Sequence, residues 1–301
     1  MQLPTPARLS ALEQWLKCAL YEHKQQNYYF LLLEEDVTCR QNIIHQLKQV
    51  SQQAHEDFRN LIIDVYDANL DPLDSPEIQA EKSNFLCKLD RFLSILDNRT
   101  LTGYLGEILT GLTVLSFSPF EINGWEIPVF LYRHHIHAYD TLEKFAQIGK
   151  IPKAVIGRAG EDNIAFLRDG QGNITKELRC EAKCSLTHNA GLIDDAHKKF
   201  DDATNTSPEI FRILLILRDY GDEESKKWAN ALRKHRWSKS EPFHLIFYAC
   251  GQLPKQKTSW IDKDTPHKNY KSSRQLQSIE VHISDVLGLI ESIYGKEKCH
   301  E

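Results

Sequence analysis

The sequence predicts an α/β protein in which a mixed β-sheet is flanked by helices. Apolar strand-like runs alternate with amphipathic helical patterns along most of the chain, the order that is typical of α/β folds. A turn-forming segment from Asp169 to Asn173 separates two strand-like runs, so these runs are expected to pair as an antiparallel hairpin. With 301 residues, of which 41% are hydrophobic, the chain can bury a substantial core.

Net charge, cysteine content and the distribution of apolar residues limit the kind of protein that the sequence can encode. The formal net charge is −5 and the pI is about 6.2, a balance that argues against tight nucleic-acid binding over the whole surface and leaves room for a local basic groove. The seven cysteines are scattered and form no CxxC pair, which favours reduced thiols. The first residues lack a signal-peptide pattern, and no apolar run reaches the ~18 residues of a membrane span. We therefore expect a soluble cytoplasmic protein with no membrane partner.

Residues 1–98 are expected to form an N-terminal α/β accessory segment. Leucines at positions 9, 12, 16 and 20 lie on one stripe and predict a first helix. Ser75-Pro76-Glu77 combines a good N-cap with a first-position proline and predicts the start of another helix. The predicted helices are 7–22, 40–58 and 75–96, and the predicted strands are 27–33 and 60–66.

Residues 99–301 are expected to form the main domain. A helix at 104–114 leads into strand and helix patterns on both sides of the predicted hairpin, and residues 251–274 read as a long, polar, lysine-rich loop. The further predicted helices are 138–148, 190–203, 223–235 and 285–294. The predicted strands are 125–132, 153–168, 174–186, 211–217, 243–249 and 279–283.

The hairpin carries the residues that indicate chemistry. Side chains alternate along a strand, so Glu181 and Lys183 project together from a run whose opposite face is apolar. The hairpin brings Asp162 near Glu181, and two close carboxylates repel unless a cation joins them. Glu107 lies in an otherwise apolar helix and is a third candidate acid. Carboxylates that hold Mg²⁺, with a lysine that places or deprotonates a water, are what metal-dependent phosphodiester cleavage needs.

Basic residues supply candidates for nucleic-acid contact. They follow the hairpin on two predicted helices, where they either bind phosphate or form ordinary solvated helix faces. A Glu-x-Lys pair alone also occurs by chance on exposed strands, so the upstream acids are what favour a site. The nucleic-acid-binding candidates are Lys198, Lys199, Arg233, Lys234 and Arg236.

Three segments together resemble the PD-(D/E)xK nuclease superfamily: GYLGEILTGL around Glu107, GRAGEDNIAF around Asp162, and RCEAKCSL around Glu181. The resemblance covers about residues 101–217 and implies a restriction-endonuclease-like core. It implies that Glu107, Asp162 and Glu181 bind Mg²⁺, with Mn²⁺ as a substitute, and that Lys183 completes the catalytic set. No proline precedes Asp162. Glu161 stands there instead, so both acids compete for the metal role, and we prefer Asp162.

The same segments are similar to the nuclease subunit of Hachiman-type anti-phage defence pairs. That resemblance implies a DNA-cleaving endodeoxyribonuclease that a partner helicase or ATPase controls. Two alternatives stay open. One is a non-catalytic module that binds nucleic acid or a partner through a degenerate nuclease fold, and the other is a ribonuclease.

Overall fold

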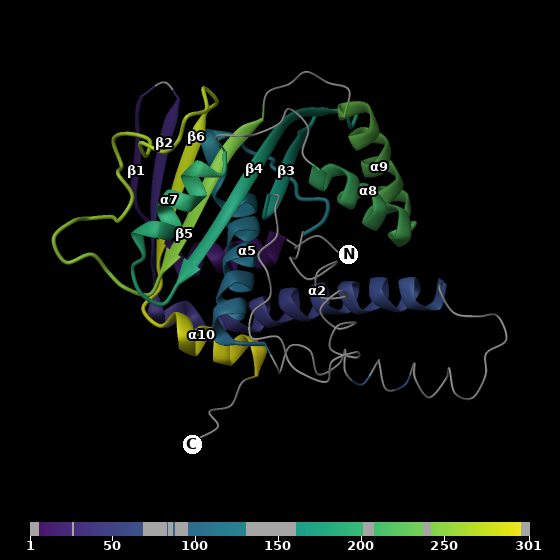
Figure 1. Ribbon diagram of the computed structural model, residues 1–301, viewed down its shortest axis with the longest axis horizontal. Coiled ribbons are helices and arrows are strands. Elements are labelled where there is room, and N and C mark those ends of the chain that lie inside the picture. Colours follow the sequence, from purple (N-terminus) through teal and green to yellow (C-terminus); the bar gives the residue numbers. More distant parts are fainter. Residues whose placement is uncertain are drawn as a thin grey trace.

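The computed structural model describes residues 6–25, 27–68, 83, 87, 96–130, 161–200, 208–236 and 242–295. They form a six-stranded sheet with helices on both faces (Figure 1). The strand order is β1-β2-β6-β5-β4-β3; β2, β6, β5 and β4 pair in parallel, and β1 and β3 are antiparallel edges. The strands are β1 Leu16–Gln25, β2 Tyr28–Glu35, β3 Asn163–Arg168, β4 Ile174–Ser185, β5 Phe243–Cys250 and β6 Leu276–His282. The predicted mixed α/β sheet is confirmed.

Local capping signals begin several of the helices. Asp97 Oδ1 accepts a hydrogen bond from the Thr100 amide at 2.7 Å, and Asp222 Oδ1 accepts one from the Ser225 amide at 2.9 Å. The helix predicted at 104–114 is confirmed as part of α5, and the helix predicted at 223–235 is confirmed as α9. The helices are α1 Pro6–Trp15, α2 Arg40–Ala68, α5 Asn98–Phe117, α7 Ala190–Lys198, α8 Pro208–Tyr220, α9 Glu223–His235 and α10 Val286–Tyr294.

Different helices cover the two faces of the sheet. On one face, Leu105 and Ile108 of α5 share an apolar core with Cys180 of β4. On the other, α7 covers the centre of the sheet through Ile193, which packs in a cluster with Ile246. In Figure 1, α7 lies in front of the sheet and α5 behind it, while α8 and α9 lie beside β3. The residues that line this third contact include Ile164, Phe166, Ile213, Trp228 and Leu232.

The N-terminal hairpin belongs to the same sheet as the main domain. Strand β2 pairs in parallel with β6, so that Leu31 lies opposite Ile279 and Leu33 opposite Val281. The boundary predicted near residue 98 therefore separates two parts of the chain that contribute strands to one sheet.

The first predicted helix is wrong beyond Trp15. The chain continues from there as β1, in which Leu16 pairs with Glu35 and Leu20 with Leu32. Pairing with β2 overrides the leucine periodicity that predicted a helix to residue 22, because tertiary contacts outweigh a weak local preference.

Two predicted strands are helical. The strand predicted at 60–66 lies inside α2, and the strand predicted at 211–217 lies inside α8. Short apolar runs do not distinguish a strand from a buried helix. In α8 the buried side chains Ile210, Ile213 and Leu217 follow helical spacing, whereas Phe211 is exposed.

The strand predicted at 125–132 is reduced to one bridge between Glu126 and Phe166 in the part of it that is described, residues 125–130. Pro128 lacks the amide that a continuous ladder needs. The helix predicted at 138–148 lies outside the described residues, as do the part of the predicted strand 153–168 before residue 161 and most of the helix at 75–96. Among the helices described, none combines the length and the apolar character needed to span a membrane.

Two histidines are buried on the face of the sheet that α7 covers, His197 in α7 and His244 in β5. His197 donates from Nδ1 to the Ile193 carbonyl at 2.8 Å, and burial lowers its pKa to about 4. His244 stacks on Phe200 at 4.2 Å and hydrogen-bonds with the Tyr270 hydroxyl. Burial, followed by the charge of Arg274, lowers the pKa of His244 to about 3. Both rings therefore stay neutral in the folded protein.

The lowered pKa values of these two histidines predict that the folded protein loses stability in mild acid. An unfolded histidine binds a proton near pH ~6.5, whereas the folded rings resist it, so the free energy of unfolding should fall below that pH by up to about 1.4 kcal/mol per pH unit for each ring. Urea unfolding at several pH values should show a shallower fall for His197→Gln than for the unsubstituted protein. His45→Gln, at an exposed histidine of α2, is the control. Equal slopes for all three proteins would contradict the assignment.

Candidate active site

A buried carboxylate on β4 is bound by two lysines. Glu181 Oε1 accepts a hydrogen bond from Lys183 Nζ at 2.5 Å, and Glu181 Oε2 accepts one from Lys199 Nζ, which follows α7. The Glu181 side chain is 2% exposed, against 18% for Lys183 and 26% for Lys199. The carboxylate is therefore buried, whereas the two lysines that bind it are partly exposed to solvent.

Asp162 lies beside this carboxylate, where β3 begins. The Asp162 amide donates to the Cys180 carbonyl at 3.0 Å, and Asp162 Oδ2 accepts from the Ala182 amide at 2.7 Å. Burial and the negative charge of Asp162 raise the pKa of the Glu181 carboxyl, while Lys199 and Lys183 lower it. The hairpin thus brings two buried carboxylates from different strands into electrostatic contact.

Glu161 belongs to a different set of contacts. Its Oε1 lies 3.6 Å from Arg179 Nη1, and Arg179 Nε donates to Glu177 Oε1 at 2.6 Å. His235 of α9 hydrogen-bonds with Glu177 at 2.7 Å. Burial alone would raise the pKa of Glu177, but the contacts with His235 and Arg179 bring it below its usual value. This arrangement favours Asp162 over Glu161 as the acid that acts with Glu181.

Glu107 approaches the site through its backbone. Its carbonyl accepts a hydrogen bond from Asn163 Nδ2 at 2.8 Å, next to Asp162 in the sequence. Helix α5 covers the face of β4 opposite Glu181. Burial raises the pKa of Tyr294 in α10, and the charge of the buried Glu107 carboxylate raises it further. Among the described residues, no three His, Cys, Asp or Glu side chains gather to hold a metal ion. A metal-binding role for Glu107 stays a prediction.

The predicted nucleic-acid-binding residues occupy different places. Lys199 contacts Glu181, whereas its neighbour Lys198 is exposed on α7. Arg233, Lys234 and Arg236 are exposed at the C-terminal end of α9, where positive charge also complements the helix dipole. Contact of these residues with nucleic acid stays a prediction.

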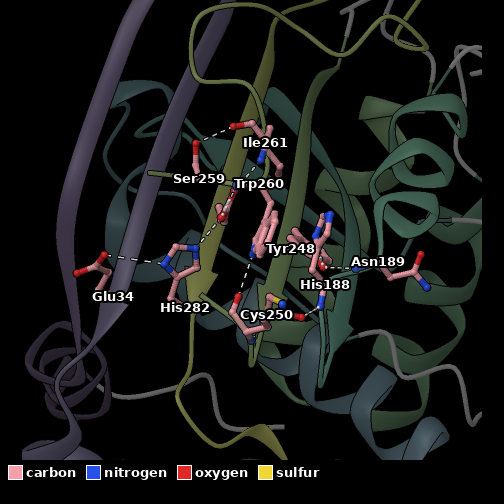
Figure 2. A network of polar contacts seen from close by, with 11 residues as sticks. Glu34, His188, Asn189, Tyr248, Cys250, Ser259, Trp260, Ile261 and His282 are labelled. Carbon is pink, nitrogen blue, oxygen red and sulfur yellow. Dashed lines mark hydrogen bonds and ion pairs between the residues drawn. The ribbon is translucent and has the colours of Figure 1, made fainter. Parts of the chain in front are cut away.

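Sequence reasoning missed a polar cluster on the same face of the sheet (Figure 2). The Glu280 carboxylate accepts from the Trp260 amide at 2.9 Å and from the Ile261 amide at 2.8 Å, and it hydrogen-bonds with His282 Nε2 at 2.6 Å. The signal for it was polar residues at every second position, Ser278, Glu280 and His282, within an apolar strand.

Close packing of α5 on β4 predicts opposite effects for two glycines of one helix. A Cβ on Gly106 would lie 3.0 Å from Cys184 Cβ, whereas a Cβ on Gly103 would meet nothing within 4 Å. Gly106→Ala should therefore lower the free energy of unfolding by about 1–3 kcal/mol through overpacking. Gly103→Ala should raise it by about 0.5–1 kcal/mol through helix propensity. Urea unfolding measures both; a Gly106→Ala protein as stable as Gly103→Ala would contradict the packing described.

Comparison of the chain with known protein families finds no matching family, and comparison with curated protein sequences finds no match either. The functional interpretation accordingly depends on the site itself.

Proposed function

We propose that this protein is a Mg²⁺-dependent endonuclease that cleaves DNA phosphodiester bonds. The observation that carries the proposal is the buried pair Asp162 and Glu181 with Lys183 beside it. Burying two carboxylates together is costly, and a structural role alone needs no such pair. Perturbed, closely coupled acids next to a lysine are typical of catalytic sites.

The donor set fits Mg²⁺ with an open coordination sphere. Mg²⁺ is usually held by one or two carboxylates and completes its shell with water and substrate phosphate. Asp162 and Glu181 supply two carboxylates, and Glu107 would be a third ligand only by the family resemblance. When bound, Mg²⁺ supplies Lewis-acid polarisation of the phosphate and a more acidic water.

The two lysines have separable roles in this proposal. Lys183 shares the strand face of Glu181, so it is placed to orient the attacking water and to stabilise negative charge that develops on the phosphate. Lys199 approaches the second oxygen of Glu181 and neutralises the buried charge from α7. Each oxygen of Glu181 accepts one hydrogen bond from these ammonium groups and keeps a second lone pair on which a metal ion would bind.

Further parts of the proposal depend on the family resemblance. The protein would be a cytoplasmic effector of an anti-phage system, controlled by a helicase or ATPase partner. Lys198, Arg233, Lys234 and Arg236 are exposed and would contact the DNA backbone.

A second candidate is a binding module without catalysis. It is favoured by one observation: both oxygens of Glu181 are already engaged by lysines, as a purely structural ion cluster would be. Loss of metal-dependent cleavage on substitution separates this candidate from the nuclease.

Cleavage assays test the proposal directly. The unsubstituted protein, Glu181→Gln and Lys183→Ala are incubated with Mg²⁺ or Mn²⁺ and with plasmid, linear duplex, single-stranded DNA or RNA. We expect DNA cleavage that falls at least about 100-fold in both variants, the usual effect of removing a catalytic group. Equal cleavage by all three proteins would contradict the proposal, as would no cleavage of any substrate with partner added. Cleavage of RNA alone would indicate the ribonuclease.

Two neighbouring lysines provide a matched pair. Lys199→Ala removes a cation from buried Glu181 and should lower cleavage at least about tenfold, with Lys199→Arg restoring much of it. Lys198→Ala removes an exposed charge and should weaken DNA binding modestly, reducing the salt slope by about one. Cleavage rates and salt-dependent binding measure these effects. If the two alanine variants behave alike, Lys199 has no special place at the site.

A further inference from the structure

The active-site lysine lies in a row of polar side chains that crosses the sheet. Parallel register places Lys183 opposite Tyr248, and Tyr248 opposite Glu280. Neighbouring strands are about 4.8 Å apart, so Tyr248 is one strand from the lysine. Strands β4, β5 and β6 all end within two residues of this row, at their carboxyl ends. In open α/β sheets, this edge is where ligands usually bind.

Two flat rings are stacked beside this row. The His188 ring lies on the Trp260 indole with centroids 3.7 Å apart and planes 8° apart. The Tyr248 hydroxyl lies 3.4 Å from His188 Nδ1 and accepts from the Asn189 amide at 3.1 Å. Figure 2 shows His188, Tyr248 and Trp260 together at the ends of β5 and β6. Tyr248, which lies opposite Lys183 on the neighbouring strand, therefore links the stack to the lysine.

Hydrogen bonds hold both rings in place. Trp260 Nε1 donates to the Gln252 carbonyl at 2.9 Å, and the Trp260 amide donates to Glu280. The His188 amide donates to Gln252 Oε1 at 3.0 Å. Both residues are half-buried. A ring that is fixed and partly exposed loses little conformational entropy when a ligand stacks on it.

The surroundings suit a nucleotide. Glu280 is fully buried and hydrogen-bonds with the Trp260 amide and with His282, away from the surface. Burial lowers the pKa of His188, the charge of Glu280 raises it and the charge of Lys257 lowers it, so one anion and one cation act on the ring. Leu186 and Leu253 are exposed large apolar side chains in the two loops that carry the stack. Flat aromatic rings beside a cation can bind a base by stacking and its phosphate by charge.

We propose that the His188–Trp260 stack is a base-binding subsite for an unpaired nucleotide next to the phosphate held at Lys183. The inference rests on the proposed nuclease function and names its substrate class. An unpaired base presents its flat face to a protein ring, whereas the bases inside a duplex are stacked on one another. The enzyme should therefore prefer single-stranded DNA, or duplex with unpaired segments, over fully paired duplex.

Binding measurements test this subsite without cleavage. Glu181→Gln serves as the parent, and fluorescence anisotropy measures its affinity for labelled oligo-dT, for an abasic strand of equal length, and for a fully paired duplex. Adding His188→Ala should weaken oligo-dT binding roughly fivefold to hundredfold, the range of base–aromatic stacking. Affinity for the abasic strand and for the duplex should change less than about twofold. His188→Phe should restore most of the loss, because it keeps a flat ring on Trp260 and removes only the contact of Nδ1 with the Tyr248 hydroxyl.

A second stacked histidine provides the control. His23 stacks on Tyr29 at 3.9 Å and 14°, on the strand pair at the opposite edge of the sheet. His23→Ala should leave all three affinities unchanged.

The subsite is overturned by a parent that does not bind oligo-dT more tightly than the abasic strand, or by a His188→Ala protein that binds all three ligands as the parent does. Equal weakening for all three ligands also overturns it, because the loss would then not involve a base. Failure of the nuclease proposal is visible separately, as cleavage that survives Glu181→Gln. If Glu181→Gln abolishes cleavage while His188→Ala keeps full oligo-dT affinity, the subsite alone is wrong.

Discussion

The candidate site depends on the burial of one carboxylate beside another. Glu181 is nearly inaccessible to solvent, and the charge of Asp162 acts on it from the adjacent strand. Such a pair is tolerated when cations compensate it or when one acid holds a proton, and Lys183 and Lys199 supply cations in the protein as it stands. Positive charge therefore stabilises the site, and a bound metal ion would supply it.

The sheet decides what surrounds this pair. Because β4, β5 and β6 are parallel and in register, Lys183, Tyr248 and Glu280 form one row at the carboxyl ends of the strands. Helix α7 covers part of that face, and α8 with α9 covers the part near β3, so the charged side chains of β4 lie between two separate apolar clusters. This position lets buried acids and half-exposed lysines occur on the same strand without breaking the core.

Local rules predicted the part of the site that is local. The turn at 169–173 and strand alternation were sufficient to place Asp162 near Glu181, and the observed hairpin agrees. The position of Lys199 depends on how α7 folds back over the sheet, which no nearby residue specifies. For Glu107, the helix was predictable, but the face of the sheet that it covers is determined by packing. The leucine stripe before residue 22 failed for the same reason, since pairing with β2 lies outside any local window.

Titration with a divalent metal tests whether Asp162 and Glu181 form one metal site. Calorimetric titration with Mn²⁺ should show one site per chain, weakened at least about tenfold by Asp162→Asn and by Glu181→Gln, because each removes an anionic ligand. Glu161→Gln, one residue away and paired with Arg179, should leave the affinity unchanged. Mn²⁺ affinity that is equal in all four proteins, or that depends on Glu161 in place of Asp162, would contradict the account.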